Sequence, residues 1–310
     1  QELAKNIMPL LSEHGNNITL NEKLFARIKA VYDQKDQANL TPEQSKLLEK
    51  VYNSFVRSGA NLEGEAKEQY RALSKELSLL TLQFGENNLK ETNDYKLVLT
   101  DPAQLAGLPQ SAIDAAAETA KEKGVEGWVF TLQAPSYSPF MTYASNRDLR
   151  CKLYMAYNTK CTHDNETNNL EIVRKLVNTR LAIAQLLGYS SFAEYNLQER
   201  MAENSGNVYK LLDQLLDAYT PTAKQEYAEV EALARQLEGS DFTVMPWDWS
   251  YYSHKLKDQK FQIDDEMLRP YFELSKVKEG VFGLATRLYG ITFKKNSDIP
   301  VYHKDVDAYE

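Results

Sequence analysis

The most informative stretch of this sequence is Met245-Pro246-Trp247-Asp248-Trp249-Ser250-Tyr251-Tyr252. Its last six positions hold four aromatic rings and one carboxylate. Proline suits the first turn of a helix, where its missing N–H is not needed, and Asp248 would then lie near the positive end of the helix dipole. So dense a group of rings indicates either a buried joint between helices or the wall of a binding cleft. The segment alone does not decide between the two.

Helical patterns dominate the sequence on both sides of this segment. Thr41-Pro42-Glu43-Gln44 has the residues of a capping box, and Thr19 is expected to cap the helix that follows it in the same way. Pro221 is expected to kink or split a helix predicted over residues 207–237. A long helix is predicted from about residue 65 to 93, because apolar side chains recur three and four positions apart, as in helical bundles: Tyr70, Leu73, Leu77, Leu80 and Phe84.

The pattern changes between residues 95 and 145, where we predict a small β element inserted into the helical chain. Tyr95–Thr100 and Trp128–Leu132 have the residue types of strands, and Met141–Tyr143 is a candidate third strand. Two further segments near the end, Ile291–Phe293 and Val301–His303, also have strand character.

These patterns together predict a mainly α, bundle-like fold with short C-terminal strands. We expect an N-terminal helical region with the β insertion over residues 1–145, and a second helical region over residues 146–310.

Composition narrows the function classes. The formal net charge of −8 argues against a general binder of nucleic acid or anionic membranes, because neutralising phosphates requires clustered Lys and Arg. No apolar run approaches the roughly 20 residues that span a bilayer. The two cysteines, Cys151 and Cys161, cannot form a disulfide framework and are expected to be ordinary thiols in a reducing compartment.

The sequence lacks the usual catalytic signatures. It has no Gly-x-Ser-x-Gly, Walker or dinucleotide glycine motif. Catalytic zinc sites often take two histidines four positions apart on one helix, and the four histidines, His14, His163, His254 and His303, are all too far apart for that. A scattered site built from His254, His303 and a distant carboxylate is the remaining alternative. We therefore assign no catalytic and no metal-binding residue in this chain.

Several sequence segments, called landmarks here, hold more charged and aromatic residues than helix packing alone requires. The order of these landmarks along the chain resembles that in a known family. They are Asn146-Arg147-Asp148-Leu149-Arg150, Arg180 with Leu186-Leu187-Gly188-Tyr189, Glu199-Arg200-Met201-Ala202, Pro246-Trp247-Asp248 with Tyr251-Tyr252, and Leu268-Arg269-Pro270-Tyr271-Phe272. In this order they resemble the thimet-oligopeptidase-like zinc metallopeptidases, above all the bacterial branch with peptidyl-dipeptidase Dcp and oligopeptidase A. The resemblance covers essentially the whole chain.

The resemblance implies a neurolysin-like or zincin-like helical lobe of an enzyme that hydrolyses short peptides in a deep channel. The family's His-Glu-x-x-His motif and downstream Glu are absent here, so the chain is expected to precede the catalytic zinc domain and to be inactive and zinc-free by itself. Zinc is expected in the intact enzyme, which would be a peptidyl-dipeptidase or oligopeptidase. A cytoplasmic location is implied, with the periplasm as the alternative.

Four residues of the aromatic segment are candidates for the channel wall: Trp247, Asp248, Tyr251 and Tyr252. The competing interpretation of these residues is helical core. A competing interpretation of the whole chain is a non-enzymatic helical scaffold or interaction module, which would need no downstream motif.

Overall fold

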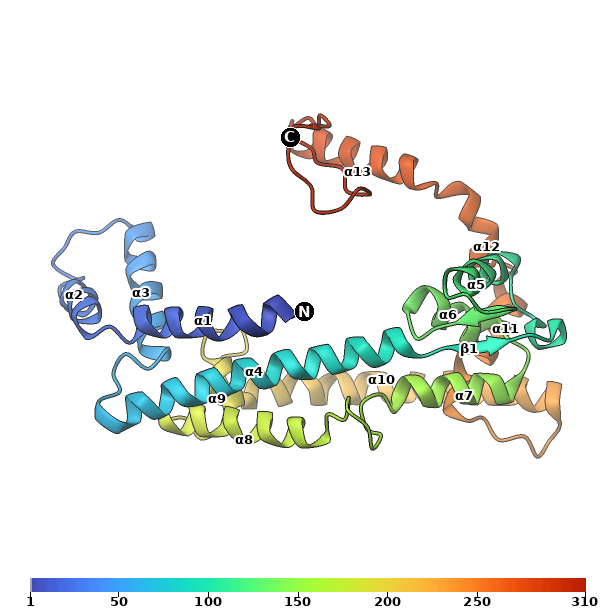
Figure 1. Cartoon of the computed structure of the whole chain (residues 1–310), viewed down its shortest axis with the longest axis horizontal. Coiled ribbons are helices and arrows are strands. Elements are labelled where there is room, and N and C mark those ends of the chain that lie inside the picture. Colours follow the sequence, from blue (N-terminus) through green and yellow to red (C-terminus); the bar gives the residue numbers. More distant parts are fainter. Residues whose placement is uncertain (1) are drawn as a thin grey trace. The chain divides into compact units, whose positions relative to one another are not determined.

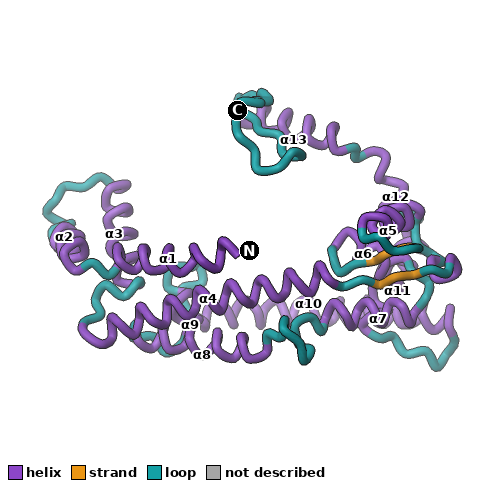
Figure 2. The backbone as a smooth tube through the Cα atoms, viewed as in Figure 1, coloured by secondary structure: helices purple, strands orange, loops and turns teal. Residues whose placement is uncertain are grey.

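The computed structural model describes residues 2–310, apart from the side chains of Glu2 and Asp265 (Figures 1 and 2). Helices account for most of it. The first elements are α1 (Glu2–Thr19), α2 (Glu22–Asp33), α3 (Pro42–Arg57), α4 (Gly64–Asp94), β1 (Leu97–Leu99), the 3₁₀ helix η1 (Pro102–Leu105), α5 (Gln110–Glu122), β2 (Trp128–Phe130) and α6 (Ala134–Tyr143). They are followed by α7 (Arg147–Asn158), α8 (Leu170–Leu186), α9 (Phe192–Leu197), α10 (Ser205–Glu238), η2 (Pro246–Asp248), α11 (Trp249–Phe261), α12 (Asp265–Leu268), η3 (Arg269–Tyr271) and α13 (Leu274–Tyr289).

The chain divides into two compact units, residues 1–249 and 250–310. The mainly α fold with a small β element is confirmed. The expected division at 145/146 marked a change in sequence character and stays a prediction. Within the first unit, one hydrophobic core draws residues from both sides of that position, for example Leu97 and Leu153.

The helical half of the first unit is organised around α4, which packs against α1 and α8. Leu20, Tyr70 and Ile183 form one buried cluster, and Leu80, Ile172 and Leu176 form another. The predicted apolar side chains of the long helix therefore pack against neighbouring helices, although Phe84, the last of them in sequence, is 40% exposed. Figure 1 shows α4 and α8 running side by side.

Side-chain caps mark the starts of these helices, and one of the two predicted caps is wrong. The Thr41 capping box is confirmed, since Gln44 N donates to Thr41 Oγ1 and Thr41 N donates to Gln44 Oε1. The prediction for Thr19 was wrong: α1 runs to Thr19, whose hydroxyl donates to Gly15 O, and Asn21 caps α2 instead. Both residues are good caps, and the local pattern placed the helix start two residues early.

The β element is a two-stranded antiparallel sheet in which Val98 pairs with Val129. Its buried face packs on Phe140, Met141 and Leu153. The prediction of a third strand at Met141–Tyr143 was wrong, because these residues end α6. A short apolar run fits a buried helix as well as a strand, and Pro135 in the first turn favours the helix.

Two other expectations also differ from the structure. Helix α10 continues through Pro221 from Ser205 to Glu238, so the proline does not split it. In the second unit, the described residues form no strand at 291–293 or 301–303 and only one antiparallel bridge, between Lys295 and Tyr309. An extended segment without a continuous partner strand cannot form the hydrogen-bond ladder of a β-sheet. Helix α13 ends at Gly290, whose φ of +70° is the left-handed conformation that glycine commonly adopts just after a helix.

Candidate functional site

Asp248 occupies the centre of a buried charged cluster in the first unit. It lies at the end of η2, while Arg147 and Arg150 lie in the first turns of α7. Because the two arginines are three positions apart, they share one face of that helix. Arg147 Nη2 is 2.7 Å from Asp248 Oδ2, and Arg147 Nε donates to both carboxylate oxygens at 3.1 Å. This is the bidentate arrangement that gives arginine–carboxylate pairs their geometric specificity.

Arg150 completes the cluster from the interior. Its Nη2 donates to Asp248 Oδ1 at 2.9 Å, and its Nη1 donates to the carbonyl oxygens of Ala144 and Ser145 at 2.7 and 3.2 Å. The Arg150 side chain is 1% exposed and the Asp248 side chain is 0% exposed, whereas Arg147 keeps 40% of its side chain in contact with solvent. A charge buried this fully is tolerated only when paired and hydrogen-bonded.

The electrostatics of the cluster favour an ionised carboxylate. Burial pushes the pKa of Asp248 upward and is the largest single influence. Hydrogen bonds from Arg147, from the Met245 backbone N–H and from Arg150 act in the opposite direction and together hold the pKa below its usual value. Asp248 is therefore a permanent anion at neutral pH and has no accessible proton to transfer. The cluster ties η2 to α7.

The four candidate channel residues do not share one environment. Trp247 is half-buried, packs against the core around the small sheet, and meets Tyr154 edge-on at a centroid distance of 6.2 Å. Tyr251 and Tyr252, in the second unit, are 8% and 2% exposed, with their rings 5.0 Å apart. Asp248 is enclosed as described above. Whether any of them contacts a peptide stays a prediction.

Trp249 is the ring of this segment that borders open space. It is 39% exposed and stacks on Tyr227 of α10, with the ring planes 7° apart. The two rings line an open, largely apolar pocket of about 560 Å³ together with Ala223, Glu226, Val244, Met245 and Pro246. Sequence reasoning did not single out Trp249, since nothing in the pattern marks which of two neighbouring tryptophans turns outward.

The described residues do not fit a catalytic zinc ion. Among residues 2–310, no group of three or more His, Cys, Asp or Glu side chains lies close enough to hold a metal ion. His303, one member of the scattered site considered from the sequence, has its Nδ1 atom 3.6 Å from Oδ2 of Asp305, two positions further along the chain.

Both cysteines are free, and Cys161 is buried. Burial, aided by a hydrogen bond to Glu91, raises the pKa of Cys161 to about 11. A thiol in that state is not a nucleophile at neutral pH.

The comparison with known protein families identifies the family of this chain. The model of peptidase family M3 matches residues 140–310, a span that includes the Arg147–Asp248–Arg150 cluster. The chain belongs to peptidase family M3. The resemblance drawn from the ordered landmarks is thereby confirmed.

Individual M3 relatives extend the match over the whole chain. Oligopeptidase A of Escherichia coli (strain K12) is 35% identical over 314 residues, covering 100% of this chain and 46% of the relative. Dipeptidyl carboxypeptidase of the same organism is 34% identical over 312 residues, again covering 100% and 46%. Probable cytosolic oligopeptidase A of Arabidopsis thaliana is 32% identical over 298 residues, covering 93% and 42%.

The chain therefore spans about half the length of the curated relatives it matches. None of the helices described in residues 2–310 is long and apolar enough to cross a membrane.

Proposed function

We propose that this chain is the N-terminal, non-catalytic portion of a zinc-dependent oligopeptidase or peptidyl-dipeptidase that hydrolyses short peptides. The observation that carries the proposal is the similarity to oligopeptidase A and dipeptidyl carboxypeptidase. It covers all of this chain but less than half of either relative. The four histidines of the sequence include no pair four positions apart, the spacing of the family's zinc motif, which supports a portion that precedes that motif. When bound in the intact enzyme, zinc would activate a water molecule for attack on the peptide bond.

In this proposal the chain contributes a helical wall to the peptide-binding channel. The Arg147–Asp248–Arg150 cluster fixes η2 on α7, and η2 in turn carries Trp247 and leads into the helix that carries Tyr251 and Tyr252. We propose Trp247, Asp248, Tyr251 and Tyr252 as the segment that supports this wall. The partners are short peptides, with no nucleic acid and no membrane, and the location is the cytoplasm or, as the alternative, the periplasm.

A chimera tests the proposal. The 310-residue chain replaces the matching segment of Escherichia coli oligopeptidase A, and the purified chimera is assayed with a quenched-fluorescence peptide and by metal analysis. We expect a zinc-loaded chimera that cleaves the peptide. A folded, zinc-loaded chimera without peptidase activity would contradict the proposal and favour the scaffold interpretation.

The isolated 310-residue chain is the matched control. We expect it to hold no stoichiometric zinc after dialysis and to leave the same peptide uncleaved. One tightly bound zinc ion per chain, or cleavage of the peptide, would show that the chain carries its own active site.

A further inference from the structure

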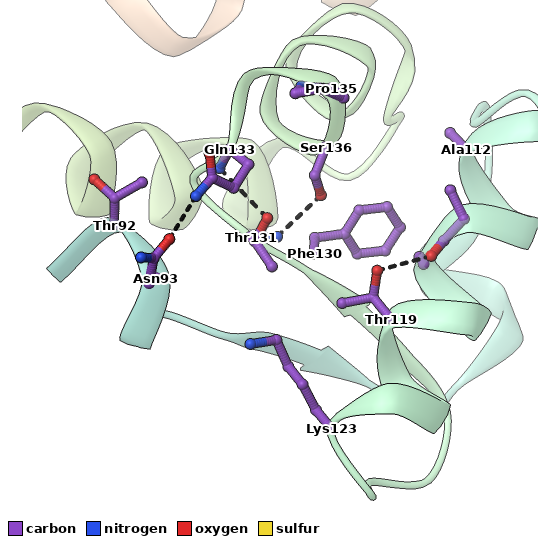
Figure 3. A pocket seen from close by; sticks show the side chains of 12 residues that line it. Thr92, Asn93, Ala112, Thr119, Lys123, Phe130, Thr131, Gln133, Pro135 and Ser136 are labelled. Carbon is purple, nitrogen blue, oxygen red and sulfur yellow. Dashed lines mark hydrogen bonds between the residues drawn. The ribbon is translucent and has the colours of Figure 1, made fainter. Parts of the chain in front are cut away.

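A pocket in the first unit, away from the Asp248 cluster, has the features of a small-ligand site. It lies between the end of α4, one face of α5, strand β2 and the start of α6, and its volume is about 420 Å³ (Figure 3). Pockets of roughly 300–1,000 Å³ suit small-molecule ligands. Its lining is Thr92, Asn93, Ala112, Ala115, Ala116, Thr119, Lys123, Phe130, Thr131, Gln133, Pro135 and Ser136.

The hollow follows from the sequence of α5. Ala112, Ala115, Ala116 and Thr119 recur at helical spacing, so one face of the helix carries only small side chains. Opposite them, the Phe130 ring forms an apolar floor and is 1% exposed. Lys123, four positions after Thr119, places a cation beside the same face, just past the end of α5.

The charge of the pocket sets it apart. Its lining includes one lysine and no carboxylate. Each of the other four pockets described within residues 2–310 has at least one Asp or Glu in its lining. In the described structure Lys123 has no ion-pair partner, unlike its neighbour Lys121, which lies 3.7 Å from Glu118. In a chain with a net charge of −8, an anion would meet no opposing carboxylate in this lining.

Two hydroxyl groups add hydrogen-bond donors at the floor. Thr131 is 8% exposed, and its Oγ1 accepts a hydrogen bond from Gln133 N at 3.3 Å. Ser136 Oγ accepts from Thr131 N at 3.0 Å. Since each oxygen is already an acceptor, its proton remains to be donated, and neither proton has an acceptor among the described residues. Figure 3 shows the Ser136 hydroxyl near Phe130 and the Thr131 hydroxyl facing Gln133.

We propose that this pocket binds the free C-terminal carboxylate of a short peptide, with the last apolar side chain on the Ala112–Phe130 floor. Lys123 supplies the charge, and the Thr131 and Ser136 hydroxyls donate to the carboxylate oxygens. The preference for a small apolar carboxylate stands on the pocket alone, whereas the choice of a peptide as its bearer rests on the proposed function.

Equilibrium binding to the intact 310-residue chain tests the proposal. The probes are N-acetyl-alanyl-leucine with a free carboxylate and the same dipeptide as its C-terminal amide, titrated at millimolar concentration by ligand-observed NMR. We expect the acid to bind about fivefold more tightly than the amide, the effect of one partly exposed ion pair. Equal binding of the two, or no binding of the acid, would overturn the proposal.

Two pairs of variants localise the binding. Lys123→Gln is expected to weaken binding of the acid about fivefold and to leave the amide unchanged, whereas Lys121→Gln, in the last turn of α5, should change neither. Ala115→Leu should fill the pocket and abolish binding, whereas Ala117→Leu, on an exposed position outside the lining, should not. Equal effects within either pair would overturn the assignment. Peptide cleavage by the chimera is measured separately, so a failure of the binding site and a failure of the proposed function are distinguishable.

Discussion

Arg150 and Asp248 are 98 positions apart in the chain, yet Arg150 Nη2 donates to Asp248 Oδ1 at 2.9 Å, with both side chains at most 1% exposed. A buried ion pair is not by itself evidence of net stabilisation, because desolvating two charges offsets most of their attraction. Removing one partner is different, since the other charge is then left buried and uncompensated.

Asp248→Ala is therefore expected to lower the free energy of unfolding by about 3–5 kcal/mol. Urea unfolding followed by tryptophan fluorescence measures the change. Glu171→Gln is the matched control, because Glu171 forms an exposed pair with Arg174 whose loss should cost under about 1 kcal/mol. Similar losses for the two variants would mean that the buried pair is not a special determinant of the fold.

The two arginines should differ in their contribution. Arg150→Ala leaves Asp248 short of a partner and also frees the carbonyl oxygens of Ala144 and Ser145, so we expect a loss of about 3–5 kcal/mol. Arg147→Ala removes a side chain that is 40% exposed, and Asp248 keeps Arg150 and the Met245 N–H, so the loss should be about 1–2 kcal/mol. The same urea experiment ranks them, and the reverse order would contradict the role given to burial.

The lowered pKa of Asp248 also predicts a pH dependence. Its folded pKa lies below the ordinary value of 3.8, so the stabilisation is fully present above that value and is lost as the pH falls through the folded pKa. Asp248→Asn should therefore show a shallower decline of unfolding free energy below about pH 4 than the natural chain. The comparison requires urea midpoints over an acidic series, and parallel declines would refute the assignment.

Much of this architecture could be predicted from local patterns. The long α4 helix, the Thr41 capping box and the two strands all depend on residues close together in sequence. The errors also have local causes. Two good caps, Thr19 and Asn21, compete for one helix start, and the apolar residues Met141–Tyr143 suit a buried helix as well as a strand.

The candidate site was harder to predict, because its contacts are long-range. The i, i+3 spacing of Arg147 and Arg150 on a helix was a usable signal that both would face one partner, but nothing local identifies that partner as Asp248. The pocket between α5 and β2 depends on how the small face of a helix meets a strand, which no single segment specifies.

Two glycines near the small sheet provide a test of backbone constraint. Gly127 and Gly124 both have positive φ, +94° and +64°, which alone costs a residue with a Cβ about 1–2 kcal/mol. At Gly127 an added Cβ would also lie 2.2 Å from Leu99 O, whereas at Gly124 it would meet nothing within 4 Å. Gly127→Ala should therefore destabilise the chain clearly more than Gly124→Ala in thermal unfolding. Equal effects would mean that strand β1 moves away from the added Cβ at no cost in stability.

Trp247→Ala separates the two interpretations of the aromatic segment. Trp247 packs on the core around the sheet and against Tyr154, so its truncation should cost about 3–5 kcal/mol of stability. Peptide turnover per folded molecule of the oligopeptidase A chimera should then be unchanged. Trp249→Ala is the control, since Trp249 is 39% exposed at an open pocket and its loss should cost less. If Trp247→Ala instead lowers turnover while leaving stability intact, the ring contacts the peptide, because a side chain that only fills the core acts through folding alone.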